Sequence, residues 1–176
     1  MAKTLSATLA ASLAWTQINT LDLSTVVDSA TLGPSSSITD GTGANQANLL
    51  WHDKRTIAAS ADDDIDLYGV LEDVFGGAVN FAVVKGLLIA NLGVSAATPV
   101  PTAGETLTIG AATVGTEFDS LFAGVGTSKL VLHSGGILFL SSPIDGLAVV
   151  ATTADILRIS NVGASSIDYS IAIIGA

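Results

Sequence analysis

The chain has 176 residues, of which 49% are hydrophobic and only 12% are charged, the reverse of the balance found in disordered chains and enough for one packed domain. Six basic residues against sixteen acidic ones give a net charge of −10, so we expect neither nucleic acid nor a membrane surface as a partner. The chain has no cysteine, which excludes disulfides, thiolate zinc sites and a cysteine nucleophile.

Residues 1–16 alternate between apolar and polar side chains. The odd positions carry Leu5, Ala7, Leu9, Ala11, Leu13 and Trp15, and most even positions carry Thr or Ser. A period of two predicts a half-buried strand, whereas a signal peptide needs an uninterrupted apolar region. No stretch reaches the about 18 unbroken apolar residues of a membrane helix. The strand is either an N-terminal arm that pairs with another subunit or an internal strand, and the pattern leaves both open.

Residues 33–48 form the most polar stretch of the chain. They are rich in Gly, Ser, Thr and Asn, which predicts a flexible loop or arm with a turn at Asp40-Gly41. We expect this loop and residues 1–16 to make contacts between subunits.

Residues 62–75 contain the most site-like cluster of the sequence. Asp62, Asp63, Asp64 and Asp66 precede apolar residues at helical spacing (Leu67, Val70, Leu71, Val74). This pattern predicts a short helix with Asp64 as its N-cap. Clustered carboxylates are also Ca²⁺ ligands, as in an adhesive domain, but the EF-hand pattern is absent. We favour the cap, assign no metal ligand, and leave Ca²⁺ binding open as a hypothesis.

The rest of the chain is predicted to be strands and turns. The expected strands are residues 79–90, 106–109, 129–133, 137–140, 147–151, 155–160 and 166–174, with a glycine-rich loop over 110–126 and a hairpin turn at 161–164. Short strands about 8–12 residues apart are typical of antiparallel sandwiches and barrels. The fold class is therefore all-β: one domain over 1–176, an antiparallel β-sandwich, jelly-roll-like, with eight to ten short strands and one short helix.

No catalytic constellation stands out. His52 lies among charged residues, His133 precedes Ser134-Gly135-Gly136, and no Gly-x-Ser-x-Gly elbow occurs. The aromatic residues Trp15, Trp51, Tyr68 and Tyr169 are too scattered to suggest a sugar platform. We therefore predict a protein that is not an enzyme, with no catalytic, cofactor-binding or metal-binding residues and no cofactor.

The order of several segments resembles small virion structural proteins of tailed bacteriophages, of the capsid cement or decoration type. The similar segments are 40–47, 50–58, 66–71, 75–76, 81–89, 134–136, 153–161 and 169–175. One departure is Ser134-Gly135-Gly136, where the family usually has Pro-Gly-Gly. The resemblance implies a jelly-roll-like sandwich on the capsid exterior that stabilises the head by bridging capsomers. It also implies the major capsid protein as partner, a homotrimer, and no catalytic residues. The alternative is a tail-fibre or receptor-binding module that recognises host surface glycans.

Overall fold

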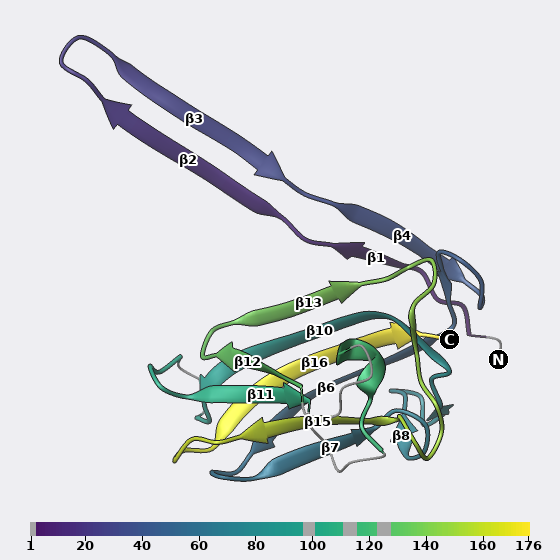
Figure 1. The fold of residues 1–176 in the computed structure, drawn as a ribbon. Helices are drawn as coiled ribbons and strands as arrows, with labels where there is room; N and C mark the ends of the chain where they lie inside the picture. Colours follow the sequence, from purple (N-terminus) through teal and green to yellow (C-terminus); the bar gives the residue numbers. More distant parts are fainter. Residues whose placement is uncertain (1–2, 97–100, 111–115, 123–127) are drawn as a thin grey trace.

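The chain folds into a two-sheet sandwich from which a long β-ribbon projects (Figure 1). The fold is seen in a computed structural model that describes residues 3–96, 101–110, 116–122 and 128–176. Parts of the loop expected over 110–126, residues 111–115 and 123–127, lie outside the described residues.

The first sheet of the sandwich has the strand order β13-β10-β16-β6. Its strands are β6 (Leu49–Ile57), β10 (Val83–Val94), β13 (Ile137–Ser141) and β16 (Ile167–Gly175), and the short β14 (Leu147–Ala148) also pairs with β10. Every neighbouring pair is antiparallel.

The second sheet has the strand order β12-β11-β15-β7. Its strands are β7 (Asp62–Asp66), β11 (Thr106–Gly110), β12 (Lys129–His133) and β15 (Ile156–Asn161), again all antiparallel. A 3-10 turn, η1 (Asp119–Phe122), and the short pair β8 (Leu71–Glu72) and β9 (Ala78–Val79) complete the described body.

Consecutive strands pass from one sheet to the other at β6–β7, β10–β11, β12–β13 and β15–β16. With four strands in each path, this alternation produces the double-sheet order of a jelly roll. The all-β, sandwich-like fold expected from the short, regularly spaced strands is confirmed.

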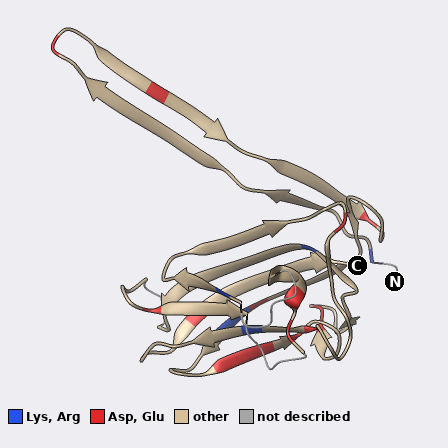
Figure 2. Cartoon of the chain, in the orientation of Figure 1, with Lys and Arg blue, Asp and Glu red and all other residues tan. Residues whose placement is uncertain are grey.

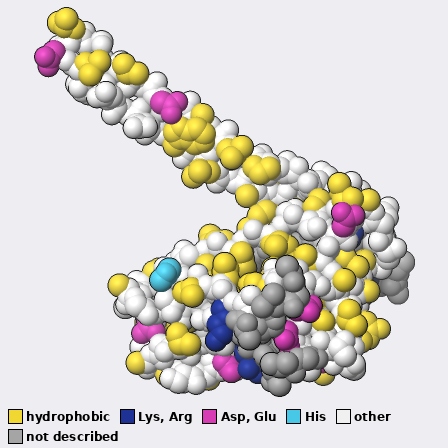
Figure 3. Space-filling view, in the orientation of Figure 1, with side chains coloured by type: hydrophobic (Ala, Val, Ile, Leu, Met, Phe, Trp, Pro, Cys, Tyr) yellow, Lys and Arg dark blue, Asp and Glu magenta, His cyan; other side chains and the backbone are white. Residues whose placement is uncertain are grey.

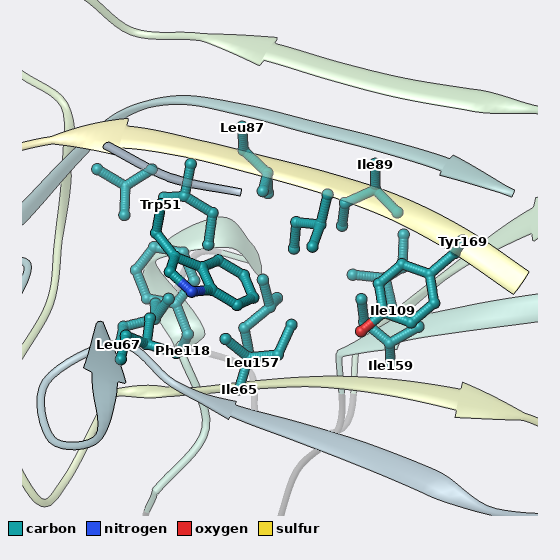
Figure 4. Packing of buried hydrophobic residues seen from close by; sticks show 14 of the residues in the cluster. Trp51, Ile65, Leu67, Leu87, Ile89, Ile109, Phe118, Leu157, Ile159 and Tyr169 are labelled. Carbon is teal, nitrogen blue, oxygen red and sulfur yellow. The ribbon is translucent and has the colours of Figure 1, made fainter. Parts of the chain in front are cut away.

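The core lies between the two sheets (Figure 4). Along β16, Ile167, Tyr169, Ile171 and Ile173 face inward and are at most 2% exposed, which confirms the alternation expected there. Leu157 and Ile159 of β15 meet them from the second sheet, and Trp51 fills one end of the core.

The helix expected after the aspartate cluster does not form. Residues 62–66 are strand β7, paired with β15, and residues 67–70 make a turn. Of the four residues on the apolar face of the predicted helix, Leu67 and Leu71 are buried, but Val70 and Val74 are 76% and 69% exposed. The strand forms although aspartate is a poor strand former, because Arg158 on β15 lies directly opposite Asp64 and offsets its charge.

The prediction of a hairpin turn at residues 161–164 is wrong. This segment is an arch, since β15 lies in the second sheet and β16 in the first. The buried side chain of Asn161 holds the arch: its Nδ2 donates to the carbonyls of Ile57, Ala58 and Ser165, and its Oδ1 accepts from Gly163 N.

Residues 33–48 are not a continuous loop. They contain β4 (Ser35–Asp40) and β5 (Gln46–Ala47), which pair with each other, and β4 also pairs antiparallel with β1 (Ala7–Ala10). The expected turn after Asp40 is present, with Gly41 at φ 135°. The ribbon then continues outward as β2 (Leu13–Thr20) and β3 (Thr25–Leu32).

Candidate interaction surface

The outer ribbon, residues 13–32, is the most unusual surface of the molecule. We call this segment the arm. Every residue of β2 and β3 is exposed, and a turn closed by Leu21 N donating to Ser24 O joins the two strands. From Ala7 to the tip, the ribbon of β1 to β4 spans about 50 Å at the usual rise per strand residue. Figure 1 shows the arm pointing away from the sandwich.

Large apolar side chains lie on both faces of the arm, and several of them are seen along the arm in Figure 3. They are Leu13, Trp15, Ile18, Leu21, Leu23, Val26, Val27 and Leu32, between 41% and 100% exposed. The register places Leu13 opposite Leu32 on one face and Ile18 opposite Val27 on the other. A lone two-stranded ribbon is marginally stable in water, and exposed apolar patches mark sites of interaction. The arm therefore has the properties of a segment that is covered by another molecule.

The arm carries almost no charge (Figure 2). Asp22 and Asp28 are its only ionisable residues, and Asp28 accepts a 3.0 Å hydrogen bond from the Trp15 indole nitrogen. Thr16 and Ser29 pair their hydroxyls across the strands at 3.1 Å. These cross-strand contacts keep the ribbon in register without burying its apolar faces.

The inner part of the ribbon, formed by β1 and β4, is fixed to the outer face of the first sheet. Leu9 and Ile38, from β1 and β4, are buried against Ile174 of β16 in a second apolar cluster. Gly86 of β10 makes this possible, because a Cβ there would lie 2.8 Å from both the Leu9 and the Ile174 side chains. The ribbon is therefore anchored at one end and free at the other.

Beside this anchor the outer face of the first sheet stays open. An apolar groove of about 260 Å³ runs between β1 and the sheet, lined by Leu50, Leu88, Phe139 and Ala172 among others. Farther along the same face, Ile137 is 66% exposed. The exposed apolar surface of the arm thus has a counterpart on the sandwich.

The aspartates that suggested Ca²⁺ binding are divided between the two faces of the second sheet. Arg158 forms a bidentate pair with Asp64, with both N···O distances 2.6 Å, and lies 3.5 Å from Asp62. Asp66 accepts from Tyr68 N as part of a turn. Among the described residues no group of three or more His, Asp or Glu side chains is placed to hold a metal ion.

Asp63 points inward, into a polar network between the sheets. It accepts from Arg55 Nε at 2.6 Å and from the Tyr169 hydroxyl at 2.8 Å. Burial alone would raise the pKa of the Asp63 carboxyl, but the hydrogen bonds from Arg55 and Tyr169 outweigh it and hold that pKa below its ordinary value. Burial next to Asp63 raises the pKa of Tyr169. The network binds the two sheets together and leaves Asp63 committed to structural partners.

The two histidines are not brought together. His52 lies on β6 in the first sheet, and His133 ends β12 in the second. Ser134, which follows His133, accepts a hydrogen bond from Thr102 N. In the described part of the chain, no helix is long and apolar enough to cross a membrane.

Sequence reasoning missed that the arm is a hairpin. It treated residues 1–16 as one strand, whereas the ribbon includes the partner strands β3 and β4 as well. One signal was available: apolar residues recur on both sides of the short turn 21–24, and no basic residue lies between 13 and 32. Compared with known proteins, the chain matches no family model, and no curated protein matches it as a relative.

Proposed function

We propose that this chain is a non-enzymatic structural protein of a tailed-phage virion, of the capsid cement type, which binds the outer capsid surface and bridges capsomers. The observation that carries the proposal is the arm, whose eight large apolar side chains are exposed at the outer end of a ribbon about 50 Å long. A ribbon of that reach contacts a neighbouring protein over an extended surface rather than in a pocket.

Two further observations support this role. The segments quoted above resemble phage decoration proteins, and the double-sheet jelly roll is a fold of viral capsid domains. The same fold also serves lectins, so the fold by itself carries no function. The binding mode, through an apolar ribbon, is what distinguishes a cement from a sugar-binding module.

The alternative is a tail-fibre or receptor-binding module for host glycans. Such a module needs exposed aromatic rings gathered at one site. Here Trp15 lies in the arm, while Tyr68 and Phe75 lie in the segment between β7 and β9. This dispersion favours the capsid proposal.

The test is co-sedimentation with empty capsids assembled from the major capsid protein of the phage that carries the gene for this chain. Wild type is compared with a variant in which residues 13–32 are replaced by a two-residue turn that joins β1 to β4. The matched control is Val131→Lys, an exposed apolar residue on the second sheet. We expect wild type and control to sediment with capsids and to delay their thermal disruption, and the arm deletion to do neither. Wild type that stays in the supernatant, and binds a glycan array instead, overturns the proposal.

A further inference from the structure

We propose that the arm of one copy docks on the outer face of the first sheet of a second copy, and that this contact, repeated head to tail, closes a ring of subunits. The inference rests on the proposed assembly role of the arm, and it names the molecule that covers the arm and the surface that receives it. The homotrimer implied by the resemblance is the ring that we test.

The receiving surface is a set of cross-strand rows on β13, β10, β16 and β6. The register places Phe139, Leu88, Ala172 and His52 side by side in one row, and Ile137, Ala90, Ser170 and Lys54 in the next. Leu88 is 38% exposed and Ile137 is 66% exposed, in the centre and at the edge of the sheet. An open sheet face with apolar side chains at this exposure favours a covering layer.

The inner part of the ribbon, β1 and β4, already packs on this face as such a layer would. Leu9 and Ile38 of the β1–β4 ribbon sit on the adjoining row, against Ile174 and Gly86. The groove begins where this contact ends, between β1 and Leu88. The face that receives the inner part of the ribbon therefore continues beyond it, uncovered, with the same apolar chemistry.

The arm does not supply this cover within its own molecule. Ala11 N donates to Pro34 O, which continues the ladder from β1–β4 into β2–β3. The ribbon therefore continues in the same direction and extends away from the sandwich, as Figure 1 shows. Since an arm and a receiving face on one chain do not meet, the contact joins two different surfaces of two copies, and repeating it gives either a closed ring, of which a reciprocal pair is the smallest, or an open filament.

Charge does not decide the occupant. The arm carries only the acidic Asp22 and Asp28. On the receiving face Lys54 is paired with Asp168 at 3.1 Å, so these two charges offset each other, and Glu72 and Asp73 lie near His52. The choice of a second copy therefore rests on the apolar rows that continue from the packing of the inner ribbon on the same face.

The free edge of β13 adds a second recognition element. Within the described ranges β13 pairs with β10 alone, and its five residues carry no charge. An uncharged edge strand presents unpaired backbone groups to a neighbouring ribbon. An arm laid across the outer face reaches this edge beside Ile137.

The experiment measures the mass of the purified protein by light scattering after size exclusion. Two interface variants are made, Ile18→Lys/Val27→Lys in the arm and Ile137→Lys on the receiving face, with Val131→Lys as the control on the other sheet. We expect wild type and control at three times the 17.6 kDa chain mass, and each interface variant at one chain mass. Circular dichroism and the Tm establish that each variant is folded. If Ile137→Lys does not fold, Leu88→Ser takes its place as the variant of the receiving face.

Mixing the two interface variants gives the sharpest result. The arm variant keeps an intact face and the face variant keeps an intact arm, so one functional contact is restored and the mixture forms a dimer of unlike chains. Because the chain has no cysteine, Ile18→Cys and Ile137→Cys introduced on separate molecules provide a cross-link with no background. A dimer in the mixture and a cross-link between the two chains support the inference.

The outcomes separate this inference from the capsid proposal. A wild type that is monomeric alone but binds capsids through its arm overturns the second copy as the occupant and keeps the cement function. A ring that depends on the arm but ignores capsids supports the inference and overturns the cement function. An oligomer that survives both interface variants overturns the docking mode.

Discussion

The hydroxyl of Tyr169 donates a 2.8 Å hydrogen bond to Oδ2 of Asp63, and so ties the central strand β16 of one sheet to the edge strand β7 of the other. Arg55, the neighbour of Tyr169 on β6, donates to the same carboxylate through Nε and Nη2. Charge-assisted bonds of this kind are stronger than neutral ones. The network is a polar connection between the two sheets, which we call the clasp.

Replacing Tyr169 with phenylalanine is expected to lower the free energy of unfolding by about 1–2 kcal/mol, because one hydrogen bond to a charged group is lost while Arg55 still satisfies Asp63. Urea denaturation measures the change. Tyr68→Phe is the matched control, since Tyr68 is 44% exposed and lies in a turn. Equal effects of the two substitutions would contradict the role assigned to the clasp.

Acid is expected to destabilise the fold through Asp63 and Asp168. Burial raises the pKa of each carboxyl, but hydrogen bonds outweigh it, from Arg55 and Tyr169 at Asp63 and from Ser95, Thr56 and Lys54 at Asp168. The pKa of each carboxyl in the folded protein therefore lies below its ordinary value. The stability they contribute is present above the ordinary pKa and is lost as the pH falls through the folded pKa. Unfolding midpoints measured from neutral pH down to below the ordinary pKa test this.

Asp63→Asn supplies the control for this pH dependence. The variant is expected to be less stable near neutral pH, where the ion pair is intact in wild type, and to lose less stability than wild type on acidification. A variant with the full acid dependence of wild type would show that other carboxylates dominate.

Calcium is expected to leave the protein unchanged. Arg55 and Arg158 engage Asp63, Asp64 and Asp62. A Ca²⁺ ion needs six or more oxygen ligands, so it would have to displace these arginines. Isothermal titration and the Tm with and without Ca²⁺ are the measurements. Binding heat that disappears in Asp62→Asn/Asp64→Asn would restore the calcium hypothesis.

Gly110, at the end of β11, is expected to tolerate no side chain. Its φ is +102°, and a Cβ would lie 2.6 Å from the Ser128 carbonyl oxygen and 2.4 Å from the Phe122 ring. Gly104 has a similar φ of +88° with nothing within 4 Å. Gly104→Ala therefore measures backbone strain alone and is expected to lower the free energy of unfolding by about 1–2 kcal/mol. Gly110→Ala is expected to lower it further, because the added Cβ also clashes. Similar Tm values for the two variants would refute the steric argument.

The sequence is informative where a pattern reports on burial. The short apolar segment over 129–133 predicts β12 residue for residue, and the alternation over 166–174 predicts β16 within one residue at either end. The period of two at the N-terminus predicts strands correctly, but not that both faces of the arm stay exposed. Alternation indicates which side chains share a face, and what covers that face lies outside the pattern.

Two features depend on contacts between residues far apart in the sequence. Asp64 sits in a strand because Arg158, 94 residues away, lies opposite it. Residues 161–164 use the Asn and Gly typical of a hairpin turn, yet β16 passes to the other sheet, since its partners β6 and β10 are there. Turn residues specify a reversal of the chain and not the sheet to which it returns.

The alternation of strands between the sheets has a consequence for the order of folding. β16 lies between β6 and β10, so the first sheet has no continuous ladder until residues 167–175 are in place. Such long-range pairing makes folding of the body slow and all-or-none. The arm, in contrast, pairs residues 13–20 with 25–32 across a four-residue turn, a local closure that takes microseconds. The apolar side chains of the arm are therefore present before the surface that we propose to receive them has formed, and until the sandwich closes they are available to other unfolded chains.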